Sequence, residues 1–129
     1  MVAPRKLYTP NEANRTLPLV RAITKDIRDI ALRMRATWDR IQHLGSGRQS
    51  EREKLEDAFE DDRQALLQMN NELEQLGVEL KDPVTGLVDF RAQRGADEVY
   101  LCWRLGEDQI DHWHKLEAGF TGRQPLATF

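Results

Sequence analysis

The chain has 129 residues, of which 40% are hydrophobic and 32% charged, and its 19 Lys and Arg against 22 Asp and Glu give a net charge of −3. This length predicts one domain over residues 1–129, and the charge balance excludes the basic footprint of a nucleic-acid-binding protein. No apolar run approaches the ~20 residues that cross a bilayer, the N-terminus lacks a signal peptide's apolar core, and one cysteine excludes an internal disulfide. We therefore expect a cytoplasmic protein that binds neither nucleic acid nor membrane.

The first half of the chain, residues 9–76, predicts a helical hairpin. Thr9 is expected to cap the first helix, and Glu12 completes a capping box. Pro18 is expected to break this helix, because its ring clashes with the preceding turn, so a short leading helix and then a long helix over residues 17–43 are predicted. Apolar residues follow the long helix at coiled-coil spacings: Val20, Ile23, Ile27, Ile30, Met34, Trp38 and Ile41.

A second long helix is predicted after the glycine-rich break at residues 45–47, and Gly77 ends it. Two helices of similar length with a short link are expected to pack antiparallel. Such a hairpin buries little surface alone, so either the C-terminal region or a second copy of the chain must cover the rest. A homo-oligomer, with a dimer favoured, is expected. The apolar seam of the second helix consists of Leu55, Phe59, Asp62, Leu66, Met69, Leu73 and Leu76.

Asp62 is the polar member of that seam. One interpretation is that Asp62 faces water or pairs with an arginine of the first helix. The other is a buried polar group that fixes register or oligomeric state. The sequence leaves both open.

Residues 77–129 predict a small antiparallel β-meander, a short helix and an extended tail. Strands are expected over residues 78–81, 87–92 and 98–104, separated by turns that contain Pro and Gly. The short helix is expected over residues 108–117, with Ile110 and Trp113 facing inward. The predicted fold class is therefore α+β.

Period-two alternation divides the third predicted strand into two faces. Val99, Leu101 and Trp103 share an apolar face that is expected to pack on the helices, whereas Tyr100, Cys102 and Arg104 share the other. In the second strand Asp89 lies on the face opposite Val88 and Phe90. A meander of this kind can bring Asp89 near Arg104.

Three segments of the C-terminal half resemble a known family: LGVELKDPVTGLVDF (residues 76–90), EVYLCWRLGE (98–107) and WHKLEAGFTGRQPL (113–126). The opening YTPNEANRTLPLVR (8–21) resembles the same family. It is the bacterial family known as domain of unknown function 2203. The resemblance implies an α+β protein with a long helical hairpin, and it carries no known activity or catalytic residue.

Two hypotheses centre on the only cysteine. Cys102 and His114, with Glu107 or Glu117 as third ligand, offer thiolate, imidazole and carboxylate groups that suit zinc or another divalent metal. Alternatively, Cys102 is a nucleophile with His114 as its base, and Arg104 lowers the pKa of the thiol. The simpler interpretation is a core cysteine and a histidine paired with a carboxylate.

A third hypothesis is anion binding by Arg104 and Arg123, with Trp103 or Trp113 as a stacking wall. The simpler interpretation has the two arginines in salt bridges with Asp89, Glu107 or Glu117, which hold the tail on the sheet. Trp, Tyr and Arg also dominate binding hot spots. The favoured function is therefore a structural or interaction protein with a possible protein partner, and the alternative is a small metal-dependent or anion-binding enzyme with its site in residues 89–123.

Overall fold

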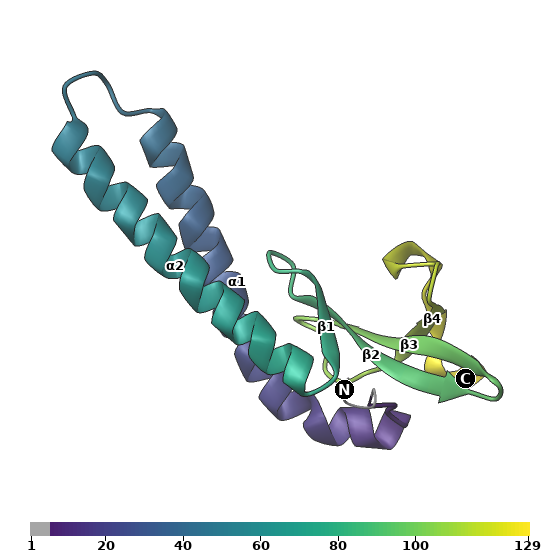
Figure 1. Ribbon diagram of the computed structural model, residues 1–129. Coiled ribbons are helices and arrows are strands. Elements are labelled where there is room, and N and C mark those ends of the chain that lie inside the picture. Colours follow the sequence, from purple (N-terminus) through teal and green to yellow (C-terminus); the bar gives the residue numbers. More distant parts are fainter. Residues whose placement is uncertain (1–5) are drawn as a thin grey trace.

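The computed structural model describes residues 6–129, so the first part of the N-terminus, on which the absence of a signal peptide was predicted, lies outside the described residues. Two long helices, α1 (Pro10–Gln42) and α2 (Gln49–Gln75), pack against each other as an antiparallel hairpin. The hairpin projects from one end of a β-sheet, with its connecting loop far from the sheet (Figure 1). Among the described residues, neither helix is long and apolar enough to cross a membrane.

The start of α1 is as predicted, but its continuity is not. Thr9 accepts a hydrogen bond from the backbone N–H of Glu12, whose side chain returns one to the N–H of Thr9. The predicted break before Pro18 is wrong, because α1 runs through Pro18 without interruption. The buried residues on either side, Leu17 and Val20, hold these turns in the core and offset the missing backbone hydrogen bond. The first turns of α1 run at an angle to the rest (Figure 1), and a proline inside a helix is a common cause of such a bend.

The two helices are joined along their length by a seam and by ion pairs. Asp62 accepts two hydrogen bonds from the guanidinium of Arg33 at 2.7 and 2.9 Å. This confirms the interpretation that Asp62 pairs with an arginine of the first helix. The guanidinium lowers the pKa of Asp62, mainly through these hydrogen bonds.

The sheet has five antiparallel strands in the order of the chain. They are β1 (Val78–Asp82), β2 (Leu87–Arg94), β3 (Asp97–Arg104), β4 (His112–Lys115) and β5 (Gln124–Pro125). One face packs on the helices: Phe90, Leu101 and Trp103 belong to the same hydrophobic core as buried residues of α1. Together with the hairpin, this sheet confirms the predicted α+β fold class.

The predicted helix over residues 108–117 is wrong. Residues 112–115 form β4, which pairs with β3 so that Leu101 lies opposite Trp113. Pairing satisfies the free backbone groups along the edge of β3, which a short helix leaves exposed. Ile110 and Trp113 are nevertheless buried, as predicted. The short helical segments of this region come later in the chain, as two 3₁₀ turns at Phe120–Gly122 and Leu126–Thr128.

Candidate functional site

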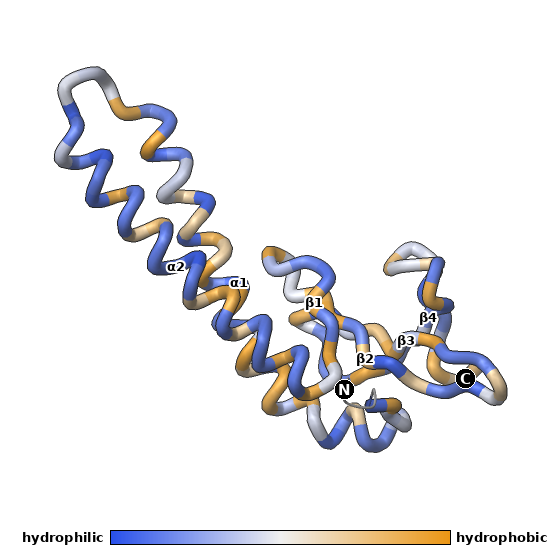
Figure 2. The backbone as a smooth tube through the Cα atoms, in the orientation of Figure 1, coloured by the Kyte–Doolittle hydropathy of each residue, from blue (hydrophilic) through white to orange (hydrophobic). Residues whose placement is uncertain are grey.

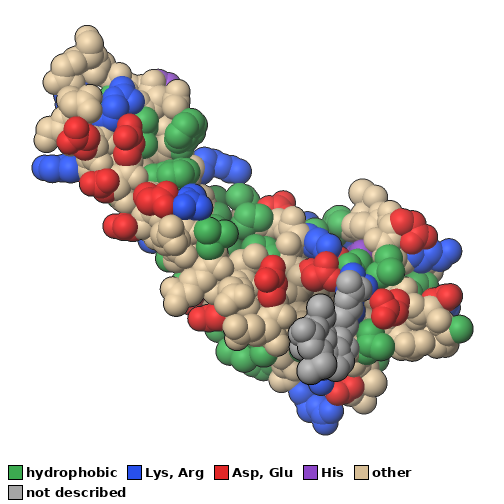
Figure 3. Space-filling model, viewed as in Figure 1, with side chains coloured by type: hydrophobic (Ala, Val, Ile, Leu, Met, Phe, Trp, Pro, Cys, Tyr) green, Lys and Arg blue, Asp and Glu red, His purple; other side chains and the backbone are tan. Residues whose placement is uncertain are grey.

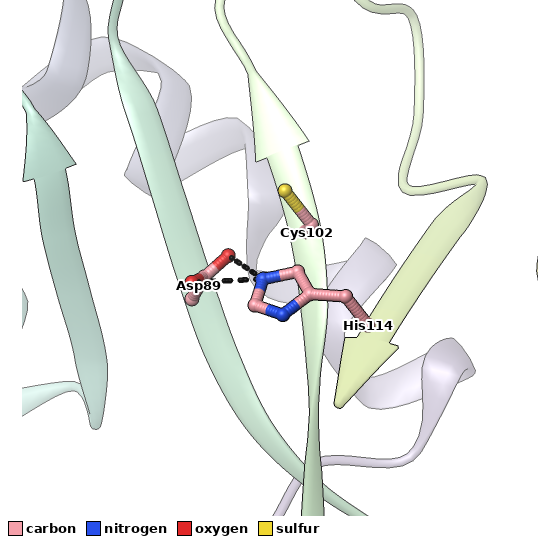
Figure 4. Close-up of side chains that lie close together, drawn as sticks. All are labelled: Asp89, Cys102 and His114. Carbon is pink, nitrogen blue, oxygen red and sulfur yellow. Dashed lines mark hydrogen bonds and ion pairs between the residues drawn. The ribbon is translucent and has the colours of Figure 1, made fainter. Parts of the chain in front are cut away.

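Three strands place an aspartate, a cysteine and a histidine, all side chains of types that bind metals in other proteins, on the sheet face that points away from the hairpin. Asp89 of β2 lies directly opposite Cys102 of β3, and His114 of β4 lies opposite Tyr100, two residues earlier on β3. The alternation of a strand puts all of them on one face. Figure 4 shows Asp89 and His114 pointing toward each other, with Cys102 beside them. One carboxylate oxygen, the sulfur and one ring nitrogen all lie within 4.8 Å of one another, and we call these three residues the triad.

The triad is buried although two of its members are polar. The exposed fraction is 3% for Asp89, 1% for Cys102 and 2% for His114. Buried polar groups require hydrogen-bond partners. The ring of His114 has one at each nitrogen: Nδ1 lies 2.7 Å from the carbonyl oxygen of Lys115, and Nε2 lies 3.1 Å from both carboxylate oxygens of Asp89.

These partners determine the protonation of His114. A carbonyl and a carboxylate both accept hydrogen bonds, so these two partners favour the ring that carries a proton on each nitrogen. Burial opposes the positive charge, but the hydrogen bonds to Asp89 and to the backbone of Lys115 outweigh it and raise the pKa of His114. The site therefore favours the charged form of the His114 ring more than water does.

The surroundings of Cys102 do not favour an activated thiol. Burial raises its pKa, and the negative charge of Asp89 raises it further, whereas the charge of Arg123 acts in the opposite direction without overcoming them. A reactive cysteine requires a lowered pKa. The expected help from Arg104 is absent, so the geometry gives no support to nucleophilic catalysis.

A second polar cluster, formed by Glu107, His112 and Arg123 and called the tail cluster below, holds the C-terminal tail on the sheet. Arg123 donates to Glu107 at 2.6 Å and also contacts the ring of His112. Glu107 in turn accepts a hydrogen bond from the backbone N–H of Arg104 at 2.7 Å. The guanidinium groups of both arginines lie over the ring of Phe120. The predicted salt bridge between Arg123 and Glu107 is confirmed.

Several predicted site residues lie elsewhere. Arg104 lies opposite Leu87, because the register pairs Asp89 with Cys102, and among the described residues no hydrogen bond or ion pair joins Arg104 to Asp89. Glu107 belongs to the tail cluster, and Glu117 lines a shallow pocket beside Trp113 and Arg94. Neither glutamate joins the triad.

Both tryptophans predicted as a stacking wall are buried in the core, and the guanidinium groups that lie over them are those of Arg21 on Trp103 and Arg94 on Trp113, not those of Arg104 or Arg123. Trp103 is fully buried and donates to the carbonyl of Glu107 at 3.0 Å, and Trp113 donates to the hydroxyl of Thr128 at 2.9 Å. Asp89, predicted as a salt-bridge partner of the arginines, takes the third place in the triad that was predicted for Glu107 or Glu117. Its signal was the alternation of the second strand, which set Asp89 opposite the apolar face.

A comparison with family models identifies one match, described as "Uncharacterized conserved protein (DUF2203)", over residues 6–126. Among curated proteins and solved structures, none is significantly similar to this chain. The family match covers both helices, all three strands that carry the triad, and the tail cluster. The chain therefore belongs to the DUF2203 family of uncharacterized conserved proteins.

Proposed function

We propose that this protein is an oligomeric scaffold that self-associates through its helical hairpin, with a second copy of the chain as the partner. The starting point is the incomplete burial of the hairpin. Within the described chain, Leu73 is the single fully buried residue of α2. Trp38, Leu32 and Leu67 are 51%, 42% and 48% exposed. Figure 3 shows apolar side chains at the surface along the hairpin, between acidic and basic ones.

The charges of the two helices favour a second copy over an unrelated occupant, and this observation carries the proposal. α1 contains seven Lys and Arg against four Asp and Glu, a net charge of +3, whereas α2 contains three against nine, a net charge of −6. α2 is predominantly hydrophilic along its length (Figure 2). In a twofold dimer each hairpin presents the same surface to the other. Packing α1 on the partner's α2 then brings opposite charges together around the apolar seam.

The hairpin is large enough for a stable interface. The 27 residues of α2 span about 40 Å, and two adjacent helices are roughly 20 Å wide. One such face therefore offers roughly 800 Å² per copy, which is the size of a standard stable interface. A four-helix bundle of this kind also covers the seam that a single hairpin leaves half exposed.

The anion-binding form of the alternative enzyme function has weaker support. Arg123 is paired with Glu107, and Trp103 is held in the core. An incoming phosphate or carboxylate must displace the carboxylate of Glu107 from Arg123 to bind there. We therefore do not assign a substrate anion to this cluster.

Sedimentation equilibrium of the full chain at micromolar concentration tests the proposal. The expected mass is twice the 15.0 kDa of one chain. Leu67→Lys, on the hairpin, is expected to shift the protein to the monomer, because a buried lysine charge opposes association. Leu116→Lys is the matched control, since Leu116 is 41% exposed but lies near the sheet. A wild-type monomer, or a dimer that both variants leave equally intact, contradicts the proposal.

A further inference from the structure

We infer that Asp89, Cys102 and His114 form a binding site for one divalent transition-metal ion of the zinc class. This site is independent of the hairpin and goes beyond the scaffold function proposed above. The three residues supply a carboxylate oxygen, a sulfur and an imidazole nitrogen, which are the three ligand types that zinc takes from proteins. They come from three adjacent strands and converge on one point of the sheet face (Figure 4).

The spacing of the triad suits tetrahedral coordination. Metal–ligand distances of about 2.0–2.3 Å place the ligand atoms of a tetrahedral zinc about 3.3–3.8 Å apart. In the structure Nε2 of His114 lies 3.1 Å from the carboxylate of Asp89, and the three ligand atoms lie within 4.8 Å of one another. Side-chain adjustments of about an ångström therefore bring all three ligands onto one ion.

His114 is already oriented as a metal ligand. Its Nδ1 is fixed by the carbonyl oxygen of Lys115 at 2.7 Å, which leaves Nε2 directed at Asp89 and Cys102. Metal-binding histidines commonly donate their second ring N–H to a backbone carbonyl in this way. The other two histidines lie in different surroundings. Nδ1 of His112 contacts the Arg123 guanidinium, and His43, whose Nδ1 also lies 2.7 Å from a backbone carbonyl (that of Asp39), is exposed after the end of α1.

The charges that the three ligands carry when bound match those of a dication. When the ion binds, its bond to Sγ replaces the proton of the Cys102 thiol, and its bond to Nε2 replaces the proton that His114 shares with Asp89; both protons leave to solvent. A thiolate, a carboxylate and a neutral imidazole then surround a 2+ ion, and the buried site has no net charge. An uncompensated charge at such a position is strongly unfavourable.

The ligand set defines the class of ion. Calcium and magnesium prefer sites made entirely of oxygen, whereas sulfur and nitrogen select zinc and neighbouring transition metals. Three protein ligands leave a fourth position for water, the pattern of an open site. The competing interpretation is a purely structural cluster, in which an ion pair lies beside an inert core thiol.

Titration of metal-free full-length protein with Co²⁺, followed by competition with Zn²⁺, separates these interpretations. Binding is expected to saturate at one ion per chain and to produce the thiolate-to-cobalt charge-transfer absorption in the near ultraviolet, which zinc then abolishes. Saturation without that absorption, or no saturable binding to the folded protein, overturns the inference. This readout uses the wild-type chain and does not depend on any variant being stable.

Variants assign the ligands. Cys102→Ser is expected to remove the charge-transfer absorption, and Asp89→Asn to weaken zinc binding at least about tenfold. His43→Ala is the control histidine and should change neither quantity. If Cys102→Ser fails to fold, zinc X-ray absorption of the wild-type protein decides instead. One sulfur with nitrogen and oxygen neighbours supports the site, and a shell without sulfur overturns it.

Discussion

Breaking the pair between Asp89 and His114 is expected to cost a large part of the folding stability of the metal-free protein. The side chains are only 4% and 2% exposed, and Nε2 contacts both carboxylate oxygens at 3.1 Å. Removing one partner of a buried ion pair costs about 3–5 kcal/mol, because the other charge stays buried without compensation. The total stability of a small domain is about 5–15 kcal/mol. Because His114 can release its proton when Asp89 is absent, the loss of stability in Asp89→Ala is expected near the lower end of the range for a broken buried ion pair, at about 3 kcal/mol.

A double-mutant cycle measures whether the two residues act as a pair. Asp89→Ala, His114→Ala and the double variant are unfolded with urea in the presence of a chelator and followed by circular dichroism. The double variant should lose less than the sum of the two single losses, with a coupling of about 0.5–3 kcal/mol. The exposed pair of Glu60 and Arg63 provides the control cycle and should show no measurable coupling. Losses at Asp89 and His114 that simply add would refute the reasoning.

Three further outcomes follow from the fold. Gly86→Ala should lower the free energy of unfolding, measured by urea titration, by more than about 1 kcal/mol, since φ of Gly86 is +70° and the new Cβ would lie 2.7 Å from Cβ of Leu105. Gly95→Ala is the control: its φ is +60° but its Cβ would meet open space, so its loss of stability should be smaller. The ion pair lowers the pKa of Asp62, so its stabilising effect is complete above the unfolded pKa of 3.8 and is lost as the pH falls through the native value. The difference in stability between wild type and Asp62→Asn should therefore vanish in acid, and a difference that persists there contradicts this assignment. Cys102 should react with iodoacetamide more slowly than free cysteine in the native protein and at the ordinary rate in urea, because burial raises the pKa of its thiol; fast alkylation of the native protein would restore the nucleophile hypothesis.

The sequence by itself determined the helical hairpin and the two faces of the central strand. Helix ends depend on local chemistry, such as the reciprocal bonds of Thr9 and Glu12, and the apolar spacing indicates which face of each helix is buried. Alternation likewise put Cys102 on the face opposite Trp103, as the structure has it. These features could be predicted because each depends on residues that are close to one another in the sequence.

Only the tertiary structure determined which residues form the triad and that residues 112–115 form a strand and not a helix. A stretch of four residues is too short for its periodicity to separate a strand from a helix, and the free edge of β3 made it a strand. Asp89 meets Cys102 and His114 only through the register of β2, β3 and β4, and a shift of one residue would turn each side chain to the other face. Register follows from packing the whole apolar face on α1, a sum over many distant contacts that no local segment of the sequence contains.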